Sequence, residues 1–135
     1  MRKIRASLIS TVGTAATLAV SLTMVAPGLA NAASYDCPSG SICFYTGDNG
    51  TGDRCVWDTA DPDWRNGAIQ CSWAADKNVR SVFNNDSDPR YSGVVYYKGA
   101  DYQDRVGCTR PGQKGNLAGT YKVRSHQWTT GQCGR

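Results

Sequence analysis

The segment Cys43–Asp53, CFYTGDNGTGD, combines residue types that often form ligand sites in loops. Glycine-rich loops cradle phosphates, and the oxygens of Asp and Asn bind calcium. A phosphate loop ends in Lys-Ser or Lys-Thr on the first turn of a helix, but the sequence after Asp53 is RCVW, which is typical of a strand. The carboxylates of Asp48 and Asp53 would also repel a phosphate. The segment therefore predicts either a calcium site or a tight β-hairpin.

Catalysis by acid–base or nucleophilic groups has few candidate residues in this chain. His126 is the only histidine, and the sequence contains no glutamate. Ser125 precedes His126 directly, but neighbours on a strand point to opposite faces, which excludes a catalytic pair. The carboxylates that lie close in sequence are Asp61/Asp63 and Asp86/Asp88. Both pairs lie in turn sequences, where Asp caps its own backbone, so we expect no enzyme; a hydrolase using two scattered aspartates is the alternative.

The first 32 residues have the layout of a secretory signal peptide. Three basic residues precede an apolar run from Leu8 to Ala26, and Ala30-Asn31-Ala32 is a small-x-small cleavage site. No basic stop-transfer cluster follows the run, so we expect no membrane anchor after signal removal. The sequence thus predicts a signal peptide over residues 1–32 and one secreted, extracellular domain over residues 33–135.

The charge of the secreted part argues against a polyanionic partner. Residues 1–32 carry three of the 15 basic residues and none of the 11 acidic ones, so their removal lowers the net charge from +4 to +1. Because no cluster of Lys and Arg remains, we expect no nucleic-acid partner and no attraction to anionic membranes.

All six cysteines lie in residues 33–135. An even number of cysteines in a short exported chain predicts disulfides, although spacing alone leaves several connectivities open. The bridges that we expect are Cys37–Cys43, Cys55–Cys71 and Cys108–Cys133. A zinc site would need CxxC pairs or more histidines, so we expect no metal at these residues.

Short runs of β-forming residues alternate with turn residues along the secreted part. The expected strands are Ile42–Thr46, Arg54–Asp58, Val79–Asn84, Gly93–Lys98 and Lys122–Trp128. Clusters of Gly, Asn, Asp, Pro and Ser separate them, which predicts an antiparallel sandwich or barrel. We expect one irregular turn of helix in the long connection at residues 59–75. The tripeptide Val-Arg-Ser occurs at residues 79–81 and 123–125, which indicates a duplicated motif.

The duplicated pattern resembles the Greek-key motifs of βγ-crystallins, in which an aromatic hairpin opens each unit and a serine of a later strand folds against it. The matching residues are Tyr45, Gly52 and Ser81 in the first unit and Tyr97, Tyr102 and Ser125 in the second. The resemblance implies an all-β, βγ-crystallin-like sandwich of two Greek-key motifs, stabilised here by disulfides. Gly50 stands where the family has an aromatic and Asp104 where it has a glycine, so we expect a looser first hairpin.

A second resemblance concerns the segment Cys37–Gly52, which is similar to the opening of the secreted Streptomyces-type metalloproteinase inhibitors. The residues in register are Cys37, Cys43, Tyr45, Gly47 and Gly52. The resemblance implies a monomeric inhibitor, without a cofactor, of a secreted, zinc-dependent, thermolysin-like peptidase. In that family the reactive bond follows a cysteine in a small loop of the second unit. The matching inhibitory loop here is Cys108, Thr109, Arg110 and Pro111, although the cysteine that closes the family's loop is missing.

Two binding functions remain as alternatives. Crystallin-type calcium sites use acidic residues near the end of each unit, but Lys77 and Arg80 stand at ligand positions of the first unit and should greatly weaken calcium binding. The other alternative is a module that binds carbohydrate or cell wall. It would use the flat rings of Trp64 and Trp73, which we expect to be exposed in the long connection.

Overall fold

The computed structural model describes residues 34–134, so the predicted signal peptide lies outside the described residues. The described residues form an all-β domain with one short 3-10 helix, η2 (Asp48–Gly50). The strands are β1 (Ile42–Tyr45), β2 (Arg54–Trp57), β3 (Val79–Asn84), β4 (Gly93–Tyr97), β5 (Arg105–Thr109), β6 (Lys114–Tyr121) and β7 (Ser125–Thr129). Between residues 34 and 134, no helix is long and apolar enough to cross a bilayer.

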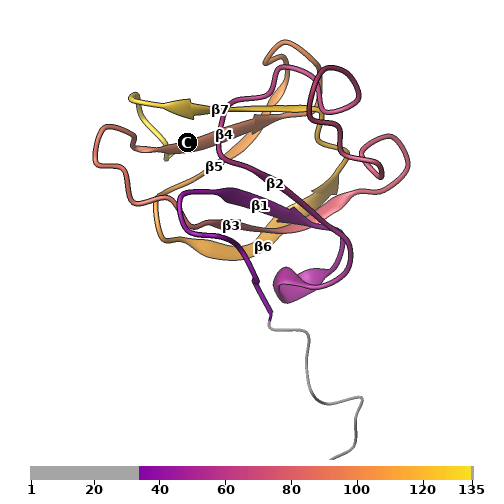
Figure 1. Cartoon of the computed structure of the whole chain (residues 1–135), viewed down its shortest axis with the longest axis horizontal. Coiled ribbons are helices and arrows are strands. Elements are labelled where there is room, and N and C mark those ends of the chain that lie inside the picture. The colour runs from indigo at the N-terminus through magenta and orange to yellow at the C-terminus, as the bar shows by residue number, and fades with distance from the viewer. Residues whose placement is uncertain (1–33, 135) are drawn as a thin grey trace, which may run out of the picture. The chain divides into compact units, whose positions relative to one another are not determined.

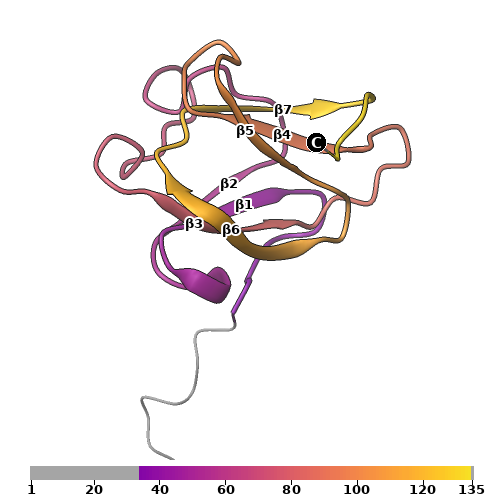
Figure 2. The ribbon, with the colours of Figure 1, turned by 180° about the vertical axis from the view of Figure 1, so that it is seen from behind.

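The seven strands form two antiparallel sheets that face each other (Figures 1 and 2). One sheet has the order β2-β1-β3-β6 and the other the order β5-β4-β7. Strand β6 comes from the second half of the chain but pairs with β3 of the first half. In return, Asp61 from the first half forms an isolated bridge with His126 of β7. Each half therefore places one segment beside the other half's sheet, and this exchange confirms the βγ-crystallin-like sandwich of two Greek keys.

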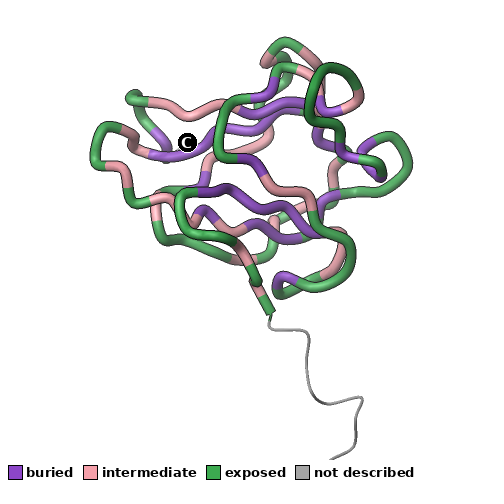
Figure 3. The backbone as a smooth tube through the Cα atoms, in the orientation of Figure 1, coloured by how far each residue is buried: buried purple, intermediate pink, exposed green. Residues whose placement is uncertain are grey.

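Large aromatic side chains fill the space between the two sheets. Phe44, Trp57 and Trp64 are 0%, 1% and 0% exposed, and the ring centroids of the two tryptophans are 4.4 Å apart in a stacked arrangement. Tyr96 of β4 meets Phe44 edge-on from the opposite sheet, at 5.5 Å. Figure 3 shows that buried residues concentrate on the central strands β1, β3 and β4, whereas most exposed residues lie in the connections and at the edges of the sheets. Burial of rings of this size provides most of the hydrophobic stabilisation that a small domain can obtain.

Strand β1 is buried on both faces, and the two faces are covered by different parts of the chain. Ile42 and Phe44 belong to the core between the sheets. Cys43 and Tyr45 alternate with them, as the pleat of a strand requires, and point to the outer face. The segment before β1 covers that outer face, since Cys37 forms a disulfide with Cys43.

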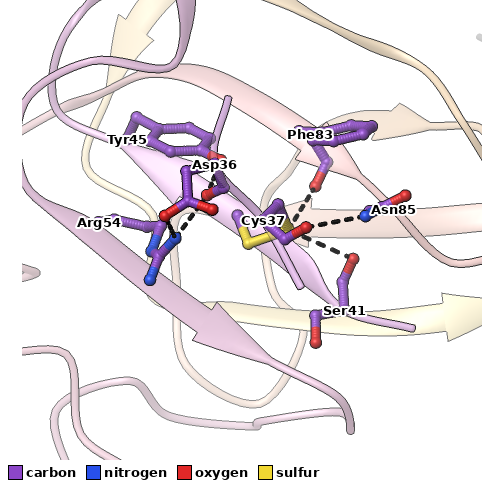
Figure 4. A network of polar contacts seen from close by, with 8 residues as sticks. Asp36, Cys37, Ser41, Tyr45, Arg54, Phe83 and Asn85 are labelled. Carbon is purple, nitrogen blue, oxygen red and sulfur yellow. Dashed lines mark hydrogen bonds and ion pairs between the residues drawn. A yellow bond between two sulfur atoms is a disulfide. The ribbon is translucent and has the colours of Figure 1, made fainter. Parts of the chain in front are cut away.

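Polar contacts hold this N-terminal segment against the sheet, as Figure 4 shows. The hydroxyl of Tyr45 donates to the carbonyl of Asp36 at 2.7 Å, and the guanidinium of Arg54 pairs with the Asp36 carboxylate at 2.8 Å. The amide of Asn85, after β3, donates to the carbonyl of Cys37 at 2.8 Å. Burial raises the pKa of the Tyr45 phenol to about 12. The segment before β1 is therefore packed as part of the folded domain.

The three disulfides are Cys37–Cys43, Cys55–Cys71 and Cys108–Cys133, which are the bridges expected from the sequence. Strands β1 to β4 lie where they were expected, within one residue at their ends. The prediction was wrong for the later strands, because β5 and β6 were not expected and β7 begins at Ser125 instead of Lys122. Strand β6 contains glycines and alternates between exposed and half-buried residues, so its sequence, KGNLAGTY, has no strong β signal.

The long connection between β2 and β3 also differs from its prediction. It contains turns and bends but no helix. Trp64 and Trp73, expected to be exposed, are 0% and 6% exposed, because the connection folds back and places both indoles in the core. Their faces are therefore not available for stacking on a sugar, and the carbohydrate-binding alternative loses the residues on which it depended.

Candidate functional site

The first hairpin folds against a serine of the first unit's last strand. Ser81 of β3 donates from its hydroxyl to the carbonyl of Gly47 at 2.6 Å, and the same oxygen accepts from the backbone N–H of Gly50 at 2.8 Å. Ser81 is completely buried, so both bonds are shielded from water. The segment Cys43–Asp53 therefore forms the hairpin that the resemblance to βγ-crystallin motifs implied, and one serine closes it.

The second hairpin repeats this arrangement. Ser125 of β7 donates to the carbonyl of Gly99 at 2.6 Å and accepts from the N–H of Tyr102 at 3.1 Å. The rings of Tyr97 and Tyr102 meet edge-on with their centroids 5.7 Å apart. The structure thus brings together Tyr97, Tyr102 and Ser125, which the sequence had placed in one motif.

The aromatic that the first hairpin lacks at position 50 is supplied by Tyr35. Its ring meets Tyr45 edge-on at 5.8 Å, and its N–H donates to the carbonyl of Gly50 at 3.2 Å. Gly50 has φ +69°, and a Cβ at this position would lie 2.2 Å from the backbone nitrogen of Tyr35. The expectation of a looser hairpin overlooked this replacement, because nothing local in the sequence links Tyr35 to position 50.

The carboxylates of the first hairpin are paired with the two cations that the sequence placed at calcium-ligand positions. Arg80 donates to both oxygens of Asp48, at 3.0 and 3.2 Å, and Lys77 lies 2.5 Å from Asp53. Each carboxylate charge is thus already compensated by a neighbouring strand or loop. No group of three or more His, Cys, Asp and Glu residues that could hold a metal occurs in the described part of the chain.

Ser125 and His126 point in opposite directions, as expected for neighbours on a strand. His126 is fully buried, its Nδ1 accepts from the indole N–H of Trp64 at 2.8 Å, and its Nε2 lies 2.9 Å from the carbonyl of Thr59. An indole N–H can only donate, so the ring proton resides on Nε2, which donates to Thr59. Burial lowers the pKa of His126 to about 4. The imidazole is therefore a neutral connector inside the core.

The stretch expected to carry the inhibitory bond begins inside a strand. Cys108 and Thr109 are the last residues of β5, Cys108 is bridged to Cys133, and Thr109 is 7% exposed. The carbonyl of Thr109 accepts from the side-chain amide of Asn84 at 2.9 Å, and its hydroxyl lies 3.3 Å from that of Tyr96. A peptidase cleft binds an extended and accessible segment, so insertion of the Cys108–Thr109 bond would require this end of β5 to open.

The exposed part of that stretch is a tight turn, which we call the Arg110 turn (residues 110–113). The N–H of Gln113 donates to the carbonyl of Arg110 at 3.0 Å, and Gly112 has φ +77°, which is the geometry of a type II turn with Pro111 at its second position. Asn84 of the other sheet holds the turn through its backbone. Its N–H donates to the carbonyl of Gln113 at 3.0 Å, and its carbonyl accepts from the N–H of Gly112 at 2.8 Å.

One ion pair that the sequence did not suggest fixes the long connection. Arg124 donates to both oxygens of Asp63, with each distance 2.9 Å, and the hydrogen bond from Arg124 holds the pKa of that carboxyl well below its usual range. The two residues are 61 positions apart in the chain, so no local pattern could have paired them.

The chain belongs to peptidase inhibitor family I36, because the model of this family matches residues 30–109, more than half of the sequence. The match covers the first hairpin with Ser81 and the turn of the second hairpin, and it ends at the last residue of β5, before Ser125. The protein is therefore a peptidase inhibitor and not an enzyme. Its family is the one that the opening segment of the sequence resembles.

Among curated proteins, none matches the chain. Among solved structures, the chain is similar to geodin, a βγ-crystallin from Geodia cydonium, with 14% sequence identity and a TM-score of 0.42. The similarity covers 67% of this chain and 49% of geodin, so it spans about half the length of that protein. The assignment of the fold rests on the strand order and on the two serine-closed hairpins.

Proposed function

We propose that the protein acts outside the cell as a monomeric inhibitor of a zinc-dependent, thermolysin-like peptidase and blocks its cleft with a rigid loop. The observation that carries this proposal is the match of the peptidase-inhibitor family to residues 30–109. The predicted signal peptide supports action outside the cell, and the resemblance of the opening segment to metalloproteinase inhibitors supports the zinc-dependent class of target.

The architecture suits inhibition by occupation of a cleft. The three disulfides tie the N-terminal segment, the connection after β2 and the C-terminal segment to strands of the two sheets. A loop with fixed ends loses little conformational freedom on binding, so more of the contact energy appears as affinity. Such a loop also resists hydrolysis, because its cleaved ends stay in place.

The test is a panel of secreted peptidases assayed with fluorogenic peptides and increasing amounts of the purified protein. The panel contains a thermolysin-like zinc enzyme, a subtilisin-like serine enzyme and a trypsin-like serine enzyme. We expect inhibition of the zinc enzyme at nanomolar concentrations and much weaker effects on the other two. Inhibition of a serine enzyme alone would contradict the zinc class, and no inhibition of any enzyme would contradict the function.

The variant Arg110→Asp tests the contact that the family resemblance implies. Arg110 is exposed, so its replacement should leave the fold intact. The matched control is Lys122→Asp, which makes the same change of charge at an exposed position outside the Arg110 turn. A loss of inhibition in Arg110→Asp, with none in the control, would assign the cleft contact to this turn.

A further inference from the structure

The connection between β2 and β3 carries an exposed loop with an aliphatic side chain at its tip. We call residues 65–70 the Ile69 loop. Ile69 is 45% exposed and is the only large exposed hydrophobic residue in the described part of the chain. Ala68 and Ile69 line a hollow of about 340 Å³ together with Trp57 and Pro62, and most of its lining is apolar. Asp61, Asp63 and Asn66 also line this hollow, and an exposed apolar patch with polar residues around it marks a contact site more reliably than one isolated side chain.

The base of the Ile69 loop is closed and anchored in the core. The N–H of Cys71 donates to the carbonyl of Trp64 at 2.8 Å, which brings the two ends of the loop together. Cys71 is bridged to Cys55 of β2, and the indole of Trp64 is stacked on Trp57 between the sheets. The loop therefore cannot shift without moving the core.

The carboxylate of Asp63 orders the first residues of the loop. Its oxygens accept from the N–H of Arg65 at 3.1 Å and from the side-chain amide of Asn66 at 2.9 Å. The bidentate contact with Arg124 fixes this carboxylate in turn. The backbone of the loop is thus organised before any partner binds, and binding should cost little ordering entropy.

The same connection contains the buried side-chain nitrogens that lack a partner within residues 34–134, which are Nε of Arg65 and Nε1 of Trp73. A buried donor without an acceptor is unfavourable for folding alone. The guanidinium of Arg65 also takes part in none of the ion pairs of the described residues. The buried Nε itself cannot reach a partner, but Arg65 as a whole is only partly buried, so the rest of its guanidinium, in the same loop as Ile69, can meet an acceptor on a partner.

The Ile69 loop and the Arg110 turn lie at opposite ends of β4. The Arg110 turn follows Thr109, which pairs with Val94 near the start of that strand. The base of the Ile69 loop is tied to the other end, because Trp64 donates to the carbonyl of Arg124 and Arg124 donates to the carbonyl of Tyr97, each at 2.8 Å. Substitutions in the two loops should therefore have independent effects.

We infer that the Ile69 loop, and not the stretch from Cys108 to Pro111, is the part of the protein that enters the peptidase cleft. Ile69 would occupy a subsite built for an aliphatic side chain, and the guanidinium of Arg65 would meet a carbonyl or carboxylate at the rim of the cleft. The inference rests on the proposed function, since it assumes that the partner is a peptidase.

The experiment compares inhibition constants of the secreted protein and three variants against a zinc peptidase that cleaves before aliphatic residues. Ile69→Asp should raise the inhibition constant by about 100-fold, because a carboxylate cannot enter an apolar subsite. Ile69→Leu should stay within about threefold of the wild type, since the aliphatic volume is retained. The control Thr130→Asp adds the same charge at an exposed position outside the loop and should not change the constant.

The outcomes separate this inference from the proposed function. If the wild type inhibits and Ile69→Asp is equally potent, the inference is overturned while the function stands. The inference is also overturned if Arg110→Asp abolishes inhibition and Ile69→Asp does not. If the wild type inhibits no enzyme of the panel, the proposed function and the inference both fail. Urea unfolding of each variant confirms that a loss of inhibition does not reflect a loss of fold.

Discussion

The buried imidazole of His126 makes the stability of this protein depend on pH in a narrow window. Its pKa is lowered from the ordinary 6.5 to about 4, because burial disfavours the charged form. The folded state therefore binds its proton only at lower pH than the unfolded state does. The resulting contribution to stability is present above pH 6.5 and is lost as the pH falls toward 4.

The size of the effect follows from the two pKa values. Between pH 7.5 and pH 4.5 the free energy of unfolding should fall by roughly 2.5 kcal/mol, at about 1.4 kcal/mol for each pKa unit. Carboxylates change the free energy of unfolding only at lower pH. The pKa of Asp88, for example, is lowered from 3.8 to about 2 by its hydrogen bond from Arg90, so its contribution is lost only below the ordinary pKa of Asp. Because the chain has only one histidine, the change in stability between pH 6.5 and pH 4.5 reports on His126.

The assay is urea unfolding followed by tryptophan fluorescence at pH 7.5, 6.0 and 4.5, with the disulfides intact. The control variant His126→Asn keeps an acceptor for the indole of Trp64 but cannot titrate. It should be less stable than the wild type at pH 7.5 and change little down to pH 4.5. Equal stability of the wild type at pH 7.5 and pH 4.5, or a parallel decline of the variant, would contradict the role of His126. An NMR titration of the imidazole should place its midpoint near 4, independent of any variant.

Three further changes test the scaffold. Gly50→Ala should lower stability by about 2–4 kcal/mol in urea unfolding, because a Cβ at φ +69° would collide with Tyr35; an unchanged midpoint would show that Tyr35 does not pack there. Ser125→Ala should cost about 1–3 kcal/mol, since it leaves backbone groups of the second hairpin without a partner; a cost below the error of measurement would contradict its role as a hairpin clamp. Replacement of Cys108 and Cys133 by alanine should lower stability by about 3.5 kcal/mol, because the disulfide closes a loop with a separation of 25 residues. Inhibition at 25 °C should be unchanged. Reduced inhibition by the folded variant would place the contact with the peptidase near Cys108.

The parts of the fold that could be predicted from the sequence are those fixed by short-range signals. Strand β3, VRSVFN, was assigned its observed bounds, because it is a short run rich in β-branched and aromatic residues with turn residues after it. The serines of the two hairpins were found because the sequence repeats around them. Strand β6 was missed because its pairing with β3 holds it in place and its own glycine-rich sequence does not.

The site was harder to predict, because its contacts join distant parts of the chain. The sequence assigned Trp64 to the surface, since it lies in a polar connection, but the connection folds over the core and buries the indole. Nothing in the sequence distinguishes Ile69 from a core residue. Its exposure follows from the disulfide at Cys71 and the contact between Asp63 and Arg124, which no local pattern reveals.

We propose that this protein inhibits a peptidase by occupying its cleft with a preformed loop. The most direct test is an active-site titration, in which a fixed amount of a thermolysin-like zinc peptidase is mixed with increasing amounts of the purified protein. We predict a linear loss of activity that reaches zero near one inhibitor per enzyme, while the inhibitor remains uncleaved. Full activity at a tenfold excess of the protein, or its rapid cleavage as a substrate, would contradict the claim.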